Sequence, residues 1–213
     1  RHRSARRGVP VSELPLMLHG DAIEALIVGG GAVAARKARA LLAAGALVRV
    51  VAPEIGEELR ALAAPDARLE LTRRAYAEGD VGSAQLVIAA TSDRAVNRRV
   101  AADAHAAHRL VNVADEPSRG NCRTTATHRS GDLVIGISAG GVPRAAARIR
   151  DSLAARLGDR YGDAVATLAT LRRRLIDDGQ QDAWRRAAEQ LLDERFCERV
   201  ENGTFAGEAE QWR

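Results

Sequence analysis

The first half of the chain alternates short apolar runs with longer segments whose apolar residues recur at helical spacing. The apolar runs predict strands at residues 24–28, 47–51, 68–71, 86–90 and 110–113. The segments between them predict helices at 32–44, 54–63 and 93–107. Strands that alternate with helices indicate an α/β fold with a parallel sheet covered on both faces.

The pattern changes after Asp115. Residues 118–130 are polar and include Thr124, Thr125 and Thr127, and they are followed by an apolar run at 132–138 that predicts one more strand. Pro143 stands at a position that suits the first turn of a helix, which we expect to run to about residue 157. Two further helices are predicted at 159–176 and 182–200, and the polar last dozen residues are typical of a disordered tail.

The composition is that of an ordinary globular protein and narrows the choice of partners. The net charge is +4, but the basic residues are spread along the chain and aromatic residues make up only 3%, so no nucleic-acid partner is expected. No apolar run reaches the roughly 18 residues of a membrane span.

The basic residues 1–7 lack a following apolar segment, so we expect a disordered tail over 1–12 and no secretory signal. Cys122 and Cys197 form no metal-type pair, which favours a reducing, cytoplasmic location.

A glycine-rich turn follows the first predicted strand and opens the first helix. Gly29-Gly30-Gly31-Ala32-Val33-Ala34 has the spacing of a dinucleotide-binding fingerprint. In this interpretation Gly29 permits the tight turn, Gly31 lets the backbone approach a pyrophosphate, and Ala34 lets the helix pack on the strand. The helix amino terminus favours phosphate, so the motif predicts a Rossmann-type domain. A glycine-rich turn of another α/β protein is the alternative.

Two further strand ends complete the predicted cofactor site. Glu54 is the only carboxylate near the end of the second strand, where an acidic residue binds the ribose of NAD, so NAD is favoured over NADP. Arg49 could favour NADP, but it lies in the middle of the strand. Thr91 and Ser92 follow the fourth strand and are expected near the cofactor, although Ser92 or Asp93 could simply cap the next helix.

Asp115 follows the fifth predicted strand at the same edge of the sheet. A carboxylate there can exchange a proton with a substrate in the crevice, and a plain turn residue is the alternative. His105, His108 and His128 lack the spacing of metal ligands, so we expect solvated histidines and no metal site.

Four sequence blocks together resemble the precorrin-2 dehydrogenase and sirohydrochlorin ferrochelatase family. They lie in the same order as in that family, over roughly residues 13–157. The blocks are Gly29-Gly30-Gly31 with Val33-Ala34 and Arg36-Lys37-Ala38; Ala89-Ala90-Thr91-Ser92-Asp93 with Val96-Asn97; Asn112-Val113-Ala114-Asp115-Glu116-Pro117; and Gly131-Asp132-Leu133 with Ile137-Ser138-Ala139-Gly140-Gly141.

The resemblance implies a homodimeric enzyme that oxidises precorrin-2 to sirohydrochlorin with NAD, and some members also insert ferrous iron. It implies that Asp115 is the catalytic carboxylate and that Ala32, Val33, Pro53 and Glu54 contact NAD. It also implies the division into a cofactor domain (13–115), a dimerisation and substrate region (116–150) and a helical region (151–213). The tetrapyrrole substrate carries many carboxylates, which would suit a chain with one lysine, Lys37, and many arginines. Genomic composition bias is the alternative reason for the arginines.

The chain departs from the family pattern in the substrate and dimer region. Residues 121–126 replace an aromatic and proline-containing stretch, Ala139 replaces a serine or threonine, and Val142-Pro143 replaces a Ser-Pro pair. These departures leave the cofactor prediction intact and bear on substrate and chelation. The other hypotheses are a nucleotide-sensing Rossmann protein and a tetrapyrrole-binding protein or chelatase without redox activity.

Overall fold

The computed structural model describes residues 13–212, which form two compact units. The first unit ends at Thr124 and the second begins at Thr125. The basic segment 1–12, for which disorder was predicted, lies outside the described residues. Among residues 13–212 no helix is both long and apolar enough to cross a membrane.

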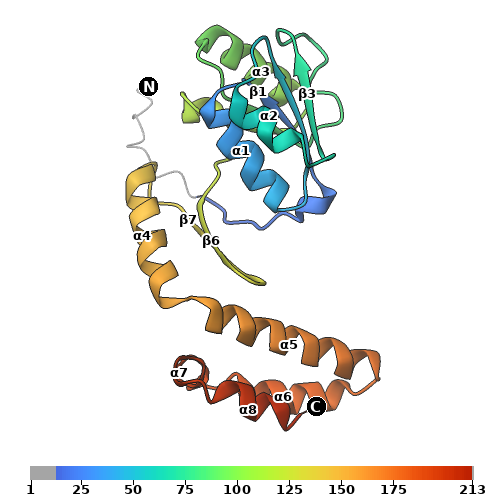
Figure 1. The fold of residues 1–213 in the computed structure, drawn as a ribbon, viewed down its shortest axis with the longest axis vertical. Helices are drawn as coiled ribbons and strands as arrows, with labels where there is room; N and C mark the ends of the chain where they lie inside the picture. Colours follow the sequence, from blue (N-terminus) through green and yellow to red (C-terminus); the bar gives the residue numbers. More distant parts are fainter. Residues whose placement is uncertain (1–12, 213) are drawn as a thin grey trace, which may run out of the picture. The chain divides into compact units, whose positions relative to one another are not determined.

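The first unit is built on a five-stranded parallel sheet (Figure 1). The strand order is β3-β2-β1-β4-β5, which matches the first five strands of the six-stranded Rossmann order. The strands are β1 (Glu24–Val28), β2 (Leu47–Ala52), β3 (Leu69–Arg73), β4 (Leu86–Ala89) and β5 (Leu110–Val113). The predicted α/β fold is therefore confirmed, and the five predicted strands are present, two with the predicted bounds and three with ends that differ by one or two residues.

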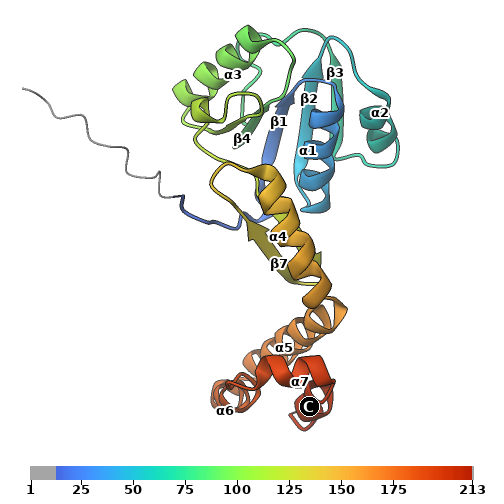
Figure 2. The same ribbon diagram turned by 90° about the vertical axis from the view of Figure 1, so that its left-hand side faces the viewer.

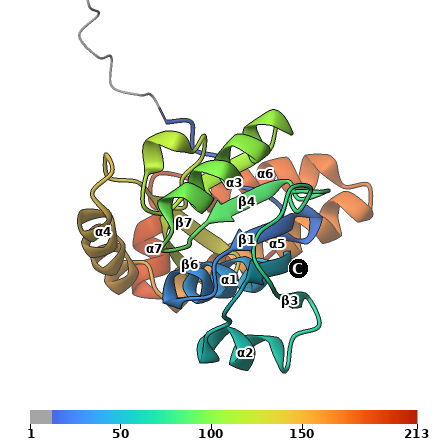
Figure 3. The same cartoon turned by 90° about the horizontal axis from the view of Figure 1, so that it is seen from above.

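Helices cover both faces of this sheet. On one face Ala34, Ala35 and Ala38 of α1 (Ala32–Ala43) pack with Leu59 of α2 (Glu57–Ala63) against β1 and β2. On the other face Val100 of α3 (Arg94–Ala106) packs against the opposite side chains of the strands. Figure 3 shows α3 on one side of the strands and α1 and α2 on the other. Helix α2 begins three residues later than predicted, because residues 53–56 form a turn instead. Short 3-10 turns lie at Gly20–Ala22 and Pro117–Arg119.

The second unit combines an antiparallel strand pair with five helices. Strand β7 (Leu133–Ile137) was predicted, whereas its partner β6 (Ala126–Ser130) lies in the segment described from its sequence only as polar. The sequence did not indicate β6, because this strand is held by backbone hydrogen bonds to β7 and not by an apolar face. Of its residues only Ser130 is buried. The helices are α4 (Pro143–Arg156), α5 (Asp159–Asp177), α6 (Gln181–Leu191), α7 (Phe196–Asn202) and α8 (Phe205–Glu210); Figure 2 shows α4 against the strand pair.

Two predictions for the carboxyl-terminal region were wrong. The single helix predicted at 182–200 is broken between α6 and α7, which lets the buried Arg199 donate to the carbonyl oxygen of Leu191 (2.9 Å) at the end of α6. The last dozen residues are not a disordered tail over their described part, because Phe205 and Ala209 of α8 are buried. The rings of Phe205 and Phe196 meet edge to face, with centroids 5.3 Å apart.

Candidate functional site

The carboxyl ends of four strands meet at one edge of the sheet in the first unit. Val28, the last residue of β1, is paired with Val51 on one side and with Ala89, the last residue of β4, on the other. Ala89 is paired in turn with Val113, the last residue of β5. The turns that follow these strands therefore lie together, at the point where the strand order reverses and where ligands of open α/β sheets bind.

The glycine-rich turn after β1 adopts the geometry that its sequence predicts. Gly29 has a φ of +130°, which residues with a side chain rarely adopt, and its N–H donates to the carbonyl oxygen of Val51 (3.0 Å). A Cβ on Gly29 would lie 2.4 Å from the carbonyl oxygen of Ala90. The first glycine therefore allows the chain to pass tightly between β2 and β4.

The turn after β2 packs directly on the second glycine. A Cβ on Gly30 would lie 1.8 Å from the carbonyl oxygen of Glu54, and the N–H of Gly56 donates to the carbonyl oxygen of Gly30 (2.9 Å). The fingerprint assigns no role to its middle position, so the importance of Gly30 and Gly56 was missed. The three consecutive glycines and the Glu-Ile-Gly sequence at 54–56 were the available signal.

Gly31 and the amino terminus of α1 leave space for an anion. Gly31 caps the helix without a side-chain hydrogen bond, and no atom lies within 4 Å of a Cβ built on it. Ala32 and Val33 in the first turn are exposed. The first N–H groups of α1 therefore face open space, the arrangement that binds a pyrophosphate in dinucleotide-binding proteins. The geometry of the glycine-rich turn and of the first turn of α1 thus fits an NAD(P) cofactor.

Pro53 and Glu54, the residues expected at the ribose, are both exposed just beyond β2. Nε of Arg73, at the end of β3, donates to the carbonyl oxygen of Pro53 (3.3 Å). Arg49, which could have favoured NADP, donates instead to the carbonyl oxygen of Asp80 (2.8 Å). The guanidinium of Arg49 is thus engaged within the fold, as its position in the middle of the strand suggested.

Thr91 lies at the end of β4 and is joined to α3 by the buried side chain of Asn97. The N–H of Thr91 donates to Asn97 Oδ1 (3.1 Å), and Asn97 Nδ2 donates to the carbonyl oxygen of Thr91 (3.1 Å). Asp93 caps α3, accepting from the N–H of Ala95 (2.7 Å) and of Val96. Of the two capping candidates, Asp93 caps the helix, and Ser92 is exposed at the sheet edge.

Asp115 lies two residues beyond β5 and is joined to the same asparagine. Asn97 Nδ2 donates to Asp115 Oδ1 (2.8 Å), and Nε of the exposed Arg94 lies 3.7 Å from Asp115 Oδ2. The Asp115 side chain is 28% exposed, so it faces solvent while one oxygen is held. The structure therefore brings Thr91 and Asp115 together, and the link between them, Asn97, was not singled out from the sequence as a functional residue.

Lys37 forms a second polar contact in this unit. Its Nζ donates to the hydroxyl of Thr124, the last residue of the unit. Burial, with a smaller contribution from Arg36, lowers the pKa of Lys37 below its usual value, and burial raises the pKa of the Cys122 thiol. The charge of each group affects the pKa of the other. Lys37 lies in α1 and Cys122 in the segment after β5, so this contact fixes that segment against α1 and is not part of the site at the sheet edge.

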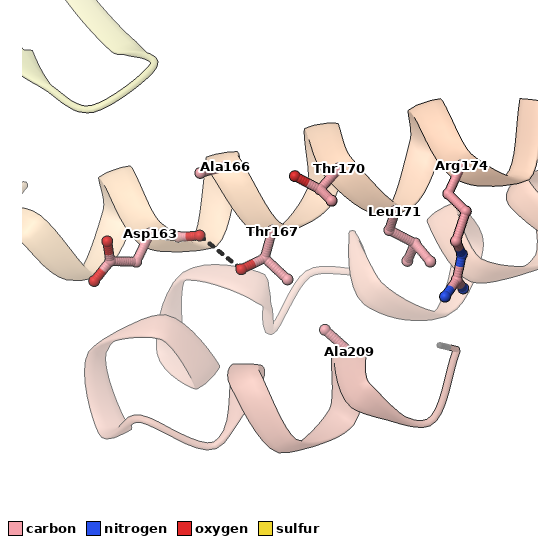
Figure 4. Close-up of a pocket in the computed structure, with 7 residues that line it drawn as sticks. All are labelled: Asp163, Ala166, Thr167, Thr170, Leu171, Arg174 and Ala209. Carbon is pink, nitrogen blue, oxygen red and sulfur yellow. Dashed lines mark hydrogen bonds between the residues drawn. The ribbon is translucent and has the colours of Figure 1, made fainter. Parts of the chain in front are cut away.

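Over residues 13–212, neither the histidines nor the second unit form a comparable group of polar side chains. His105 and His108 are exposed, and His128 contacts the carbonyl oxygen of Leu157 (2.7 Å). Among residues 13–212, no group of three or more His, Cys, Asp or Glu side chains could hold a metal ion. A groove of about 560 Å³ lies between α5 and α8 of the second unit (Figure 4). Within it the hydroxyl of Thr167 donates to the helix backbone at Asp163 (2.8 Å), and Arg174 donates to the carbonyl oxygen of Trp212.

Comparison with known proteins shows the family to which the chain belongs. Residues 16–126, more than half of the chain, match a family described as "Putative NAD(P)-binding". The chain is 38% identical over 200 residues to a siroheme synthase of Saccharophagus degradans, covering 93% of this chain and 43% of that protein. It is 41% identical over 172 residues to a siroheme synthase of Pseudomonas fluorescens, covering 79% of this chain and 37% of that protein.

A solved structure also matches over nearly the whole chain. It is that of SirC, a precorrin-2 dehydrogenase, with a TM-score of 0.70 and 25% sequence identity over 93% of this chain and 100% of SirC. The chain spans less than half the length of the two siroheme synthases but the full length of SirC. The chain therefore belongs to the putative NAD(P)-binding family, and the resemblance to precorrin-2 dehydrogenases that its four sequence blocks predicted is confirmed.

Proposed function

We propose that this chain oxidises precorrin-2 to sirohydrochlorin with NAD, the activity that the name of SirC states for that protein. The observation that carries the proposal is the placement of a part-exposed carboxylate, Asp115, at the same sheet edge as the glycine-rich turn. A nucleotide-sensing protein would need the turn but not the carboxylate. The similarity to siroheme synthases adds support for a tetrapyrrole substrate.

The cofactor site accounts for the phosphate and ribose ends of NAD. The open face of Gly31 and the first turn of α1, with Ala32 and Val33, would hold the pyrophosphate. Pro53 and Glu54 would lie at the ribose, where a carboxylate accepts from a free 2′-hydroxyl and repels a 2′-phosphate. The engagement of Arg49 with Asp80 removes one cation that could have favoured NADP. Thr91 and Ser92 would lie toward the nicotinamide half.

The chemistry divides between the cofactor and Asp115. NAD, when bound, supplies the hydride acceptor. Removing two hydrogens from the reduced macrocycle releases a hydride and a proton, and the chain must accept the proton. Asp115 is the carboxylate placed to do so, with its Oδ2 directed away from the hydrogen bond to Asn97. Exposed arginines suit the carboxylates of the substrate.

We propose that the assembly is a homodimer in which residues 116–150 supply much of the contact. Strand β7 is only half buried, and Val142 and Ile149 at and within α4 are 56% and 46% exposed. Apolar side chains of this kind gain stability by burial against a second copy.

Incubation of the purified chain with precorrin-2 and NAD tests the proposal. We expect the absorption spectrum of sirohydrochlorin to develop together with an equimolar amount of NADH. Binding of NAD without turnover would instead favour the nucleotide-sensing hypothesis. An anaerobic repeat with ferrous iron, followed for a sirohaem spectrum, tests chelation separately.

A further inference from the structure

Asn97 occupies a position that its helix does not favour. It lies inside α3 and is 1% exposed, and asparagine there has a lower helix propensity than alanine. Its side chain points to the sheet edge, where it bonds to the backbone of Thr91 twice and to Asp115 once. The Thr91 hydroxyl donates to the same Oδ1 (2.8 Å). Both ends of the amide are therefore occupied.

The backbone of Thr91 fixes the direction of this amide. A backbone N–H can only donate and a carbonyl can only accept, so Oδ1 must face the N–H of Thr91 and Nδ2 its carbonyl oxygen. A reversed amide would set its oxygen against the Thr91 carbonyl and the Asp115 carboxylate. One hydrogen of Nδ2 therefore goes to Thr91, and the second points to Asp115 Oδ1 at 2.8 Å.

This arrangement distinguishes the two oxygens of Asp115. Oδ1 accepts from a buried N–H, and turning away would leave that donor unpaired, which is unfavourable in a buried site. Oδ2 lies on the other side of the carboxylate, where the nearest cation is the exposed Arg94 at 3.7 Å. Asp115 lies in a turn beyond β5, so the orientation of its carboxylate depends on this contact.

We propose that Asn97 is a positioning residue that directs Oδ2 of Asp115, and not Oδ1, to accept the substrate proton. Asn97 also links Oδ1 of Asp115 to Thr91, and therefore to the end of β4 beside the glycine-rich turn. The inference rests on the proposed function, because the step it serves is the removal of a proton from the macrocycle while the hydride passes to NAD. The electron pair of one C–H bond leaves with the hydride to NAD, the electron pair of the bond that loses the proton forms the new double bond of the macrocycle, and the proton ends on Asp115 Oδ2.

The decisive variant is Asn97→Asp, which keeps the shape and the acceptor for the N–H of Thr91 but replaces Nδ2, the donor to both Asp115 and the Thr91 carbonyl oxygen, with an oxygen. We expect kcat to fall about 10- to 100-fold, since misplacing a reacting group by about 1 Å costs that much. The KM for precorrin-2 should stay within about twofold of the parental value, because the buried Asn97 side chain does not itself contact the substrate. An unchanged kcat would overturn the inference.

A double variant separates positioning from a general loss of structure. If Asn97 acts through Asp115, Asn97→Asp should lower kcat no further in an Asp115→Asn background. Additive losses in the two variants would overturn the inference. Tyr76→Phe is the matched control, because it removes a hydrogen bond to the same helix, from the Tyr76 hydroxyl to Asp103 (2.7 Å), away from the sheet edge. It should lower Tm without changing kcat.

An NMR measurement tests the contact between Asn97 and Asp115 without turnover, so the outcome for this contact can be separated from the outcome for the proposed function. The side-chain amide resonances of Asn97 in the Asp115→Ala variant should shift and lose protection from hydrogen exchange, because their acceptor is gone. Unmoved resonances would overturn the inference even where the parental chain oxidises precorrin-2. Shifted resonances in a parental chain without turnover would support the link to Asp115 and place the failure in the proposed function.

Discussion

A methyl group on Gly30 would lie 1.8 Å from the carbonyl oxygen of Glu54, so the turn after β2 rests directly on the turn after β1. The contact is between backbones, and neither side can rotate away as a flexible side chain would. It joins the residues expected at the pyrophosphate to those expected at the ribose. Gly30, the middle glycine of the turn, therefore holds together the segments expected at the pyrophosphate and at the ribose.

Gly30→Ala should destabilise the first unit. Forcing a methyl group into packed backbone typically costs about 1–3 kcal/mol, and here the segment 53–56 must move away. Thermal unfolding should show a lower Tm, and NAD affinity should fall with it. A parental Tm would show that the two turns are not in contact in solution.

Gly31→Asp should remove NAD binding without lowering the stability of the fold. Its backbone is extended, with φ −90° and ψ −172°, and nothing lies within 4 Å of a Cβ there, so the fold tolerates a side chain. The carboxylate would occupy the pyrophosphate space and repel it, so NAD binding measured by calorimetry should be lost at an unchanged Tm. Gly31→Ala is the control for bulk alone and should weaken binding less. Parental affinity in the folded Gly31→Asp variant would exclude this turn as the phosphate site.

Asp115→Asn should separate chemistry from binding. The asparagine can still accept from Asn97 Nδ2 through its oxygen but cannot take up a proton. Turnover of precorrin-2 should fall about 100- to 10,000-fold, the usual contribution of a general base, at parental NAD affinity. Glu116→Gln, which neutralises the next carboxylate and its ion pair with Arg119 (2.8 Å), is the control and should retain activity. Parental turnover by Asp115→Asn would make this carboxylate structural.

The homodimer prediction can be tested at α4. Ile149→Glu replaces an apolar side chain that is 46% exposed, and a charge buried against a second copy would be strongly unfavourable. Light scattering at micromolar concentration should give a dimer for the parental chain and a monomer for this variant. Leu47→Glu, at an equally exposed position before residue 116, should remain dimeric. A monomeric parental chain would contradict the prediction.

The Arg74–Asp80 pair should make the first unit sensitive to acid. Hydrogen bonds from Arg74, with 2.6 and 2.7 Å between heavy atoms, lower the pKa of the buried Asp80 carboxyl below its usual value. A carboxyl with a lowered folded pKa stabilises the fold above its unfolded pKa of about 3.9, and this stabilisation is lost as pH falls through the folded value. Because Arg74 is 46% exposed, solvent screening keeps this effect small.

Asp80→Asn is the variant that isolates this effect. Denaturant unfolding at pH 7 should show it to be less stable than the parental chain, and the difference should shrink toward pH 3. A difference that stays constant with pH would mean that Asp80 contributes through packing and not through its charge.

Local patterns were sufficient where one segment carried both the structure and its signal. The apolar runs of β1, β4 and β5 are buried on both faces and could form little else than central strands. The glycine spacing at 29–31 requires a tight turn wherever it occurs between a strand and a helix. Asp93 accepts from N–H groups two and three residues further on, so its capping role depends on local spacing alone.

Local patterns failed where the evidence for an element lies in another part of the chain. β6 is polar and becomes a strand because β7 supplies its hydrogen bonds. The break between α6 and α7 depends on Arg199, whose guanidinium contacts the end of α6, Asp193 (2.7 Å) and Glu208 (3.1 Å) at once. The apolar residues Phe205, Ala209 and Trp212 recur at helical spacing and could have indicated α8, but their burial against α5 and α7 is a tertiary fact.

The amino-acid sequence by itself determined the parallel α/β fold, the dinucleotide-binding turn and the strand ends that carry Thr91 and Asp115. Each of these follows from side-chain burial and backbone conformation within about ten neighbouring residues. Only the tertiary structure decided that Gly30 packs against the backbone of Glu54 and that Asn97 joins Thr91 to Asp115. These contacts link residues 24 and 18 positions apart through hydrogen-bond directions and steric limits. Such contacts leave no periodic signal in a sequence, because each depends on where the sheet places two separate turns.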